Sequence, residues 1–328
     1  MDSISVKAFA KINLSLDVTG RRADGYHLIR SVMQAIDLCD VVTVQTCTGT
    51  EDRISSEPSI ALSVDYASEI PPAENLPTDI SNTAYKAAAE MAVCFSISNP
   101  HIKIHIQKNI PASAGLAGGS ADAAAVILAL NKVWQLNADL AALNEVGLRV
   151  GADVPFCLAA AAKNNPLLGL SEDPLASSAA LCEGIGEILT PLPSARGEAI
   201  LLKPALAVST ARIYKLFDEK SAPEERPDTE TLIRYLKSDP ASRTNLTQLT
   251  GNMINVLEEI TASEYPVVAE ILYAVKETIP ADRIMMSGSG PTVFAYFGSQ
   301  RPLENACAVL RIKMHKNSGL RIIITKLL

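Results

Sequence analysis

A stretch of small residues leading into an alanine-rich segment most constrains how this chain folds. Residues 111–121 read Pro-Ala-Ser-Ala-Gly-Leu-Ala-Gly-Gly-Ser-Ala, and we expect the segment that follows, 122–133, to be helical. Because these residues have small side chains or none, their backbone N–H groups are exposed. Exposed N–H groups just ahead of a helix can bind phosphate. The same stretch would also let a helix pack closely on a sheet, so by itself it leaves both interpretations open.

Neither of the common nucleotide-binding loops is present. The chain has no G-x-x-x-x-G-K-[ST] motif, and residues 111–121 do not fit G-x-G-x-x-G. A phosphate site in this stretch must therefore be of another type.

The composition predicts a globular enzyme-sized protein. With 328 residues, 48% hydrophobic and 20% charged, the chain is long enough for roughly two domains and a large core. No apolar run approaches the roughly 20 residues that span a bilayer, and residues 1–7 lack the pattern of a secretory signal. We therefore expect a cytoplasmic protein with no membrane partner.

The net charge argues against a nucleic-acid-binding protein, and the cysteine spacing argues against zinc-binding and disulfide-rich proteins. A net charge of −7 argues against nucleic acid as a partner, and a phosphorylated ligand would need a lysine, a helix N-terminus or Mg²⁺ nearby. The six cysteines form no C-x-x-C pair, so their spacing predicts neither a zinc site nor a disulfide framework. Most should be small buried hydrophobic residues in a reducing compartment.

Helical and strand patterns alternate without a regular βαβ rhythm, which predicts an α+β fold in two layers. We expect a strand or a bent pair of strands at 4–18, and strands at 41–46, 101–107, 199–208, 292–297 and 320–326. We expect helices at 82–95, 122–133, 138–150, 229–238, 247–260, 265–278 and 302–313. Segment 28–38 is a strand or a short helix, 49–80 contains loops, and the low-complexity segment 159–180 is expected on the surface.

Two charged residues stand in apolar surroundings. Lys11 lies in an apolar strand, where a buried amine is costly unless it is paired, although the ammonium could also extend to water. Asp153 precedes an apolar run and could serve as a helix N-cap, as a catalytic carboxylate, or as both. The residues alone leave these alternatives open.

The histidines predict no metal site. His101 and His105 share a strand face but stand about 13 Å apart, too far to bind one metal. His27 is different because it adjoins Tyr26 in a glycine-bearing loop, where an aromatic ring and a hydrogen-bonding neighbour could hold a flat ring. Tyr26 could equally anchor the loop. Residues 287–291 form a second small-residue stretch, which indicates a tight turn.

Three blocks in this order resemble the GHMP small-molecule kinases: Lys11-Ile12-Asn13-Leu14, 111–124 and 287–292. Blocks 20–27, 151–156 and 184–191 narrow the resemblance to the branch that phosphorylates a cytidyl diphosphate of 2-C-methyl-D-erythritol for non-mevalonate isoprenoid synthesis. It covers nearly the whole chain. It implies a two-domain α+β fold, with an N-terminal α/β domain (1–195) holding the ATP loop and a smaller ferredoxin-like domain (196–328).

The resemblance also implies site residues. Asp153 matches the general base, and Lys11 the lysine that orients it. The positions matching the ATP site are Asn75, Lys108, Pro111, Ala112, Ser113, Ala114, Gly115, Leu116, Ala117, Gly118, Gly119, Ser120 and Ala121. Mg²⁺ would bridge the phosphates, with Ser120 as a ligand directly or through water. The positions matching the substrate site are Asn13, Tyr26, His27, Thr210 and Tyr214, with the two tyrosines sandwiching the cytosine.

The chain departs from the family at two places, and two other functions compete. Ala121 stands where the family commonly has a second serine, and the segment 159–180 is longer than usual. Another GHMP activity, on homoserine, mevalonate or a diphosphate that is decarboxylated, is disfavoured because those substrates have no cytosine for the Tyr26–His27 loop. A non-enzymatic binding module is disfavoured by the −7 charge and by Lys11 and Asp153. A monomer and a homodimer both remain open.

Overall fold

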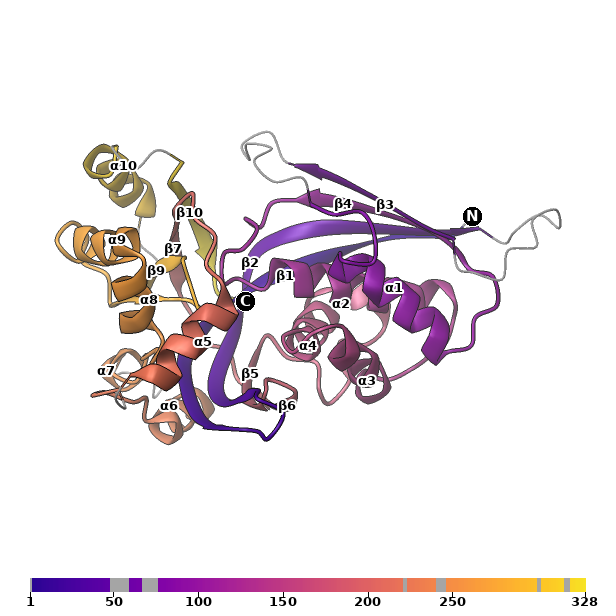
Figure 1. Cartoon of the computed structure of the whole chain (residues 1–328), viewed down its shortest axis with the longest axis horizontal. Coiled ribbons are helices and arrows are strands. Elements are labelled where there is room, and N and C mark those ends of the chain that lie inside the picture. The colour runs from indigo at the N-terminus through magenta and orange to yellow at the C-terminus, as the bar shows by residue number, and fades with distance from the viewer. Residues whose placement is uncertain are drawn as a thin grey trace. The chain divides into compact units, whose positions relative to one another are not determined.

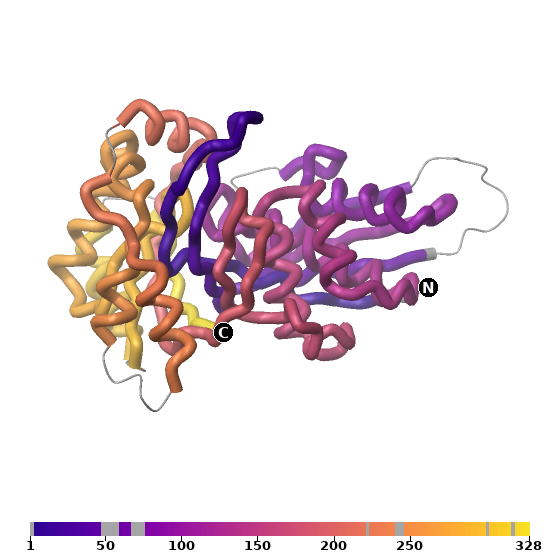
Figure 2. Tube along the Cα trace, turned by 90° about the horizontal axis from the view of Figure 1, so that it is seen from below, coloured from indigo at the N-terminus to yellow at the C-terminus, as the bar shows by residue number. Residues whose placement is uncertain are grey.

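The computed structural model describes residues 2–47, 59–66, 76–220, 223–239, 246–299, 302–315 and 319–328. These form two compact units. The first unit comprises Met1–Ala10, Leu38–Ala112 and Ala117–Ser178, and the second unit comprises Lys11–Asp37, Ser113–Leu116 and Ala179–Leu328. Two long paired strands, β1 (Asp2–Arg21) and β2 (His27–Cys47), contribute to both units (Figures 1 and 2). The boundary expected after residue 195 stays a prediction.

The sheet of the first unit has the order β3-β4-β2, with β4 (His101–Lys108) antiparallel to β2 and parallel to β3 (Ser59–Tyr66). The alternation expected at 101–107 is confirmed, since Ile102, Ile104 and Ile106 are buried. β3 lies in the segment 49–80, which was expected to contain loops and for which no strand was predicted. Its alternation is short and flanked by polar residues, so the sequence signal for a strand was weak there.

Four helices complete the first unit: α1 (Thr83–Cys94), α2 (Gly118–Val133), α3 (Leu140–Val150) and α4 (Val154–Asn164). α2 packs against the other three, and its alanines permit that close approach. It begins at Gly118, inside the small-residue stretch and earlier than expected.

The expectation that segment 159–180 lies on the surface is wrong for its first part. Ala159–Ala162 are buried within α4, which packs against α2. An alanine run looks like low complexity in sequence, but its small side chains let two helices approach closely. The short 3₁₀-helix η1 (Pro166–Leu168) follows α4.

The second unit contains an antiparallel sheet of order β10-β7-β9-β8. Its strands are β7 (Glu198–Lys203), β8 (Arg283–Met286), β9 (Val293–Phe297) and β10 (Arg321–Lys326). Two further strands, β5 (Ala179–Gly184) and β6 (Ile188–Leu192), continue from β2 in the order β2-β5-β6. The strand alternative for 28–38 is therefore correct, because that segment is part of β2.

The helices of the second unit are α5 (Thr210–Glu219), α6 (Thr229–Lys237), α7 (Leu246–Thr250), α8 (Glu258–Glu264), α9 (Pro266–Lys276) and α10 (Leu303–Lys313). The single helix expected at 247–260 is instead α7, an irregular connection and α8. Gly251 and Asn252 interrupt the helical pattern there, as residues of low helix propensity do. No helix among the described ranges is long and apolar enough to cross a membrane.

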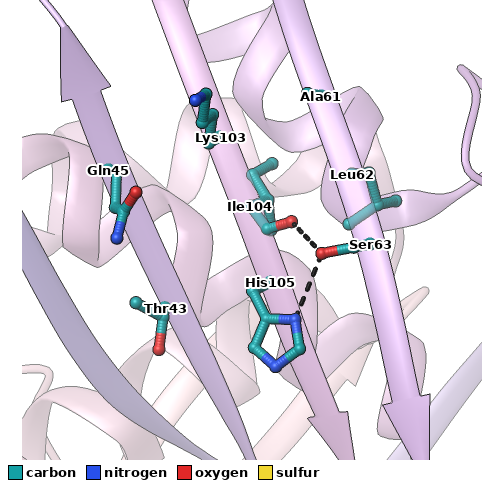
Figure 3. A pocket seen from close by; sticks show the side chains of 8 residues that line it. All are labelled: Thr43, Gln45, Ala61, Leu62, Ser63, Lys103, Ile104 and His105. Carbon is teal, nitrogen blue, oxygen red and sulfur yellow. Dashed lines mark hydrogen bonds between the residues drawn. The ribbon is translucent and has the colours of Figure 1, made fainter.

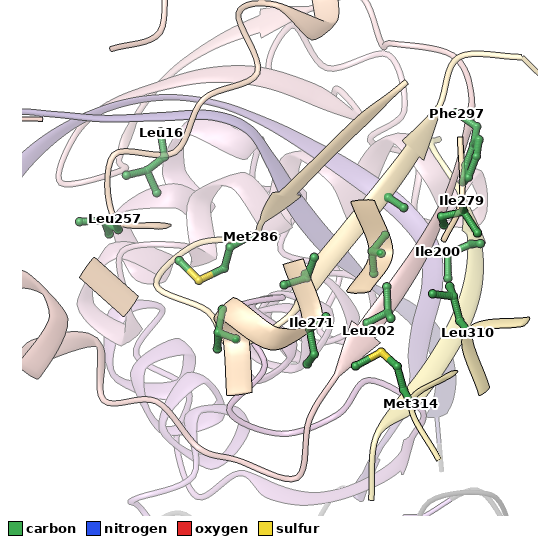
Figure 4. Packing of buried hydrophobic residues seen from close by; sticks show 14 of the residues in the cluster. Leu16, Ile200, Leu202, Leu257, Ile271, Ile279, Met286, Phe297, Leu310 and Met314 are labelled. Carbon is green, nitrogen blue, oxygen red and sulfur yellow. The ribbon is translucent and has the colours of Figure 1, made fainter. Parts of the chain in front are cut away.

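One apolar core holds the second unit together (Figure 4). It joins Leu202 of β7 and Phe297 of β9 to Ile271 of α9 and Leu310 of α10, all of them buried. Leu16 of β1 belongs to the same core, and its backbone N–H and C=O bond Ile254 and Val256. The strand that carries Lys11 is thereby fixed to this unit.

Candidate active site

Within the second unit, the structure brings together one part of each of the three GHMP-like blocks. Lys11 N donates to the carbonyl of Leu116 (3.1 Å), and Ser287 Oγ donates to the carbonyl of Gly115 (3.0 Å). Gly115 has φ +73°, and a Cβ there would stand 2.4 Å from the carbonyl oxygen of Ser287. Only glycine allows the two loops to approach this closely.

Lys11 is buried rather than extended to water, with 4% of its surface exposed. Its Nζ donates to Asn13 Oδ1 (2.7 Å), and a Cβ on Gly288 would lie 3.5 Å from that Nζ. Asn13 Nδ2 in turn donates to Ser31 Oγ (2.8 Å). A buried positive charge is therefore held beside the 287–291 loop. Asn13 is fully buried and both ends of its amide are bonded, so its direct contact with substrate stays a prediction.

The small-residue stretch has an unusual backbone. Ser113, Gly115 and Ala117 have φ values of 48°, 73° and 58°, so every second residue is left-handed. This conformation costs about 1–2 kcal/mol for a residue with a side chain. Backbones that mix right- and left-handed residues turn successive N–H groups toward one concave side, where anions bind. This geometry supports the phosphate interpretation. Ser120 lies half-buried in the first turn of α2.

A buried cluster of three ionisable side chains lies against the start of α2 in the first unit. Lys108 Nζ donates to Asp40 Oδ2 and to Asp122 Oδ2, the latter at 2.7 Å. Asp40 Oδ1 also accepts the backbone N–H groups of Asn109 and Ile110. A Cβ on Gly118 would stand 3.5 Å from Lys108 Nζ, so the ammonium lies directly against the first residue of α2. Direct contact between Lys108 and a nucleotide stays a prediction.

One ammonium cannot neutralise two buried carboxylates, so one of them holds a proton. Asp40 receives three donors, whereas Asp122 Oδ1 is buried with no hydrogen-bond partner among the described residues. Burial raises the pKa of Asp122 from 3.8 to about 8, against the opposing effect of Lys108 and with a further push from Asp40. Burial alone would lower the pKa of Lys108, but the two carboxylates outweigh it and raise that pKa. Asp122 is the protonated member at neutral pH.

A separate group of residues in the second unit surrounds His27. Its ring lies 4.8 Å from the Tyr214 ring, centroid to centroid, at an interplanar angle of 30°. His27 Nε2 lies 2.7 Å from Asp218 Oδ1, and Arg21 Nη1 lies 3.1 Å from Asp218 Oδ2. Tyr26 is 61% exposed, so its ring face is accessible to a ligand.

Thr210 joins this region to the 287–291 loop. It is the first residue of α5, and its Oγ1 lies 2.8 Å from Ser289 Oγ. Of the predicted substrate positions, the structure therefore joins His27 to Tyr214 directly, and it ties Thr210 to the loop beside Lys11.

The remaining predicted positions are in the first unit or outside the described ranges. Asp153 occupies the N-cap position of α4, half-buried, but its side chain makes no capping hydrogen bond. Asn75 lies outside the described residues. Within the described residues no three His, Cys, Asp or Glu side chains are grouped to hold a metal.

A hollow on the outer face of the first unit's sheet has none of these features (Figure 3). Ser63 Oγ lies 3.1 Å from His105 Nδ1. The other residues that line the hollow are Thr43, Gln45, Ala61, Leu62, Lys103 and Ile104. These side chains stand on open strands, without a glycine turn or a helix N-terminus. The hollow shows that the His105 face of β4 is the outer one.

Four polar residues of these clusters were not predicted from sequence: Asp40, Asp122, Asp218 and Asn255. Asn255 Nδ2 donates to the carbonyls of Met286 and Gly288 and so fixes the second loop. The sequence contains a pattern that could have indicated two of them. Asp218 follows Tyr214 by four residues, the spacing of neighbours on one helix face, and Asp40 interrupts an apolar strand. The other two depend on contacts made only in the fold.

Comparison with known proteins places the chain in a family. The GHMP kinases N terminal domain matches residues 82–161, and the GHMP kinases C terminal domain matches residues 240–316. A 4-diphosphocytidyl-2-C-methyl-D-erythritol kinase of Caldicellulosiruptor bescii is 38% identical over 94% of both chains. One of Alkaliphilus oremlandii is 41% identical over 93% of this chain and 92% of its own. The chain belongs to the 4-diphosphocytidyl-2-C-methyl-D-erythritol kinase family.

Solved structures agree with this membership. A crystal structure of 4-(cytidine 5'-diphospho)-2C-methyl-D-erythritol kinase is similar with a TM-score of 0.68 and 26% identity over 99% of both chains. A homoserine kinase from Cytophaga hutchinsonii has the same TM-score at 18% identity, which shows a common fold alone. The α+β GHMP fold and the family resemblance expected from the sequence are thus confirmed.

Proposed function

We propose that this protein is an ATP-dependent kinase that transfers the γ-phosphoryl group to the 2-hydroxyl of 4-diphosphocytidyl-2-C-methyl-D-erythritol, in non-mevalonate isoprenoid precursor biosynthesis. The observation that carries the proposal is near-40% identity to kinases of that name over almost the full chain. The interlocked loops around the buried Lys11 support it, because phosphoryl transfer depends on positioning and charge stabilisation.

In this reaction the 2-hydroxyl oxygen forms a bond to the γ-phosphorus, and the bond between that phosphorus and the β,γ-bridging oxygen breaks. Asp153 is proposed to accept the hydroxyl proton, a contribution of typically 10²–10⁴-fold. Lys11 is proposed to orient that carboxylate and to offset negative charge at the transferring group. Its buried, hydrogen-bonded ammonium suits the second role, since a desolvated charge acts strongly at short range.

ATP is proposed to bind through residues 111–121, whose left-handed residues and helix start suit a triphosphate. Mg²⁺ usually binds through substrate phosphates, water and one or two protein ligands. Ser120 would hold it directly or through water, and the ion would neutralise phosphate charge.

The cytidyl group is proposed to bind at Tyr26, His27 and Tyr214. Stacking on an aromatic side chain is worth about 1–3 kcal/mol per base, enough to select a substrate that carries one. Homoserine and mevalonate have no base, so an enzyme for those substrates would gain nothing from the exposed Tyr26 ring.

A coupled assay of ADP release tests the proposal. With MgATP, the cytidyl substrate should give turnover, whereas mevalonate and homoserine should give none above the ATPase background. Turnover with mevalonate or homoserine, and none with the cytidyl substrate, would contradict the proposal and favour another GHMP activity.

A further inference from the structure

One face of α5 carries three residues at four-residue spacing: Thr210, Tyr214 and Asp218. Residues so spaced lie one above another on a helix. Tyr214 packs against the face of the His27 ring, and Asp218 bonds its Nε2 edge. A single helix thus holds the imidazole by face and edge, and 11% of the His27 side chain remains exposed.

The edge contact determines which ring nitrogen of His27 carries hydrogen. An ionised carboxylate can only accept hydrogen bonds, so His27 Nε2 must donate to Asp218 Oδ1. The Arg21 guanidinium, which can only donate, lies 3.1 Å from the other oxygen, so both oxygens of the Asp218 carboxylate act as acceptors. In a neutral imidazole with hydrogen on Nε2, Nδ1 is a hydrogen-bond acceptor.

We propose that Asp218 is a positioning residue that makes His27 selective for cytosine over uracil. At the corresponding ring position cytosine has an exocyclic amine, which donates, whereas uracil has a carbonyl oxygen, which accepts. His27 Nδ1, held as an acceptor, pairs with the amine and faces the uracil oxygen with a second acceptor. This inference rests on the proposed function, since it assigns the base discrimination to the same cytidyl site.

The Asp218→Asn variant tests the proposal because it should reverse the imidazole. Arg21 can only donate, so it holds the amide oxygen of the new side chain and turns the amide NH₂ toward His27. Nε2 then accepts and Nδ1 carries the hydrogen. A mismatched pair of polar groups loses a hydrogen bond and leaves both groups unsatisfied, so the cytidyl-to-uridyl ratio of kcat/KM should fall about 5- to 150-fold. Most of the change should appear in KM, with kcat nearly constant.

Two further variants separate positioning from loss of structure. Asp218→Ala removes the contact without reversing the ring, so its ratio should fall less than in Asp218→Asn. Glu264→Gln breaks the Arg212–Glu264 pair, which also joins α5 to another helix (3.1 Å). Glu264 and Asp218 side chains are each 32% exposed, and Glu264→Gln should leave the ratio unchanged.

Nitrogen NMR of the histidine rings gives a readout that needs no substrate. With the His27 signals assigned by their loss in His27→Gln, the wild type should show hydrogen on Nε2, and Asp218→Asn should show it on Nδ1. A wild-type ring with hydrogen on Nδ1, or on both nitrogens, would overturn the proposal, as would an unchanged base preference in Asp218→Asn. Failure of the proposed function looks different, because the wild type would then not turn over the cytidyl substrate while the ring signals still report on Asp218.

Discussion

The buried Lys108–Asp40–Asp122 cluster makes stability depend on pH in a way that one substitution should remove. Asp122 is protonated in the folded protein below about pH 8, because burial raises its pKa, whereas in the unfolded chain it ionises near pH 3.8. Between these values the folded state binds one more proton than the unfolded state. The stabilising contribution of Asp122 to the folded state is therefore complete below about pH 4, and it is lost as the pH rises through about 8.

The size of the effect follows from this proton. One proton changes the free energy of unfolding by about 1.4 kcal/mol per pH unit, so the wild type should lose about 3 kcal/mol from this group between pH 5.5 and 7.5. Asparagine has the shape of the protonated acid and cannot titrate. Asp122→Asn should therefore gain on the wild type as the pH rises, and the difference between their free energies of unfolding should grow by about 3 kcal/mol between pH 5.5 and 7.5.

Urea unfolding followed by tryptophan fluorescence measures this directly. The only tryptophan in the chain, Trp134, is the C-cap residue of α2, the helix that carries Asp122. Asp65→Asn is the matched control, since its side chain is 77% exposed and should leave the pH slope unchanged. An Asp122→Asn slope equal to that of the wild type would refute the reasoning, because Asp122 would then be ionised in the folded protein.

Three other substitutions test the loops and the base site. Tyr26→Ala should raise KM for the cytidyl substrate about 5- to 150-fold through lost stacking, with KM for ATP unchanged; steady-state kinetics decide, and an unchanged cytidyl KM would contradict stacking. Gly115→Ala should lower the free energy of unfolding, measured in urea, by about 3 kcal/mol or more, because the new Cβ would meet the Ser287 carbonyl. The control Gly20→Ala should lower it by less than about 1 kcal/mol, because the nearest atom to its new Cβ is 3.6 Å away. Ala117→Gly should stabilise the protein by up to about 1 kcal/mol by relieving its left-handed backbone, and a loss of stability would show that the methyl group is needed.

Local patterns explain why much of the fold was predictable. β4 alternates isoleucine with polar residues, and α1 follows an asparagine whose side chain caps it, so each is specified by its own residues. β2 was harder, because its 21 residues pair with different strands in its two halves and its apolar pattern changes along the way. The alanines of α4 have no strong period at all, and only their packing against α2 shows them to be buried.

In the candidate site, too, local sequence motifs were predictable and contacts made only in the fold were not. The blocks around Lys11, Gly115 and Gly288 are each recognisable in sequence, and the structure brings them into contact. Their supports were not predictable, since Asn255 reaches the Gly288 loop from more than 30 residues away in sequence. The partners of Lys108 were hidden as well, because Asp40 and Asp122 come together only when β2, β4 and α2 pack.

The central claim is that this protein moves the γ-phosphoryl group of ATP to the 2-hydroxyl of the cytidyl substrate. Phosphorus NMR of a reaction with MgATP tests it, with Asp153→Asn in parallel. The account predicts one new phosphomonoester signal, coupled to the branched carbon of the methylerythritol group, formed in step with ADP and at least about 100-fold more slowly in Asp153→Asn. ADP accompanied only by inorganic phosphate, or a phosphomonoester at another hydroxyl, would contradict it.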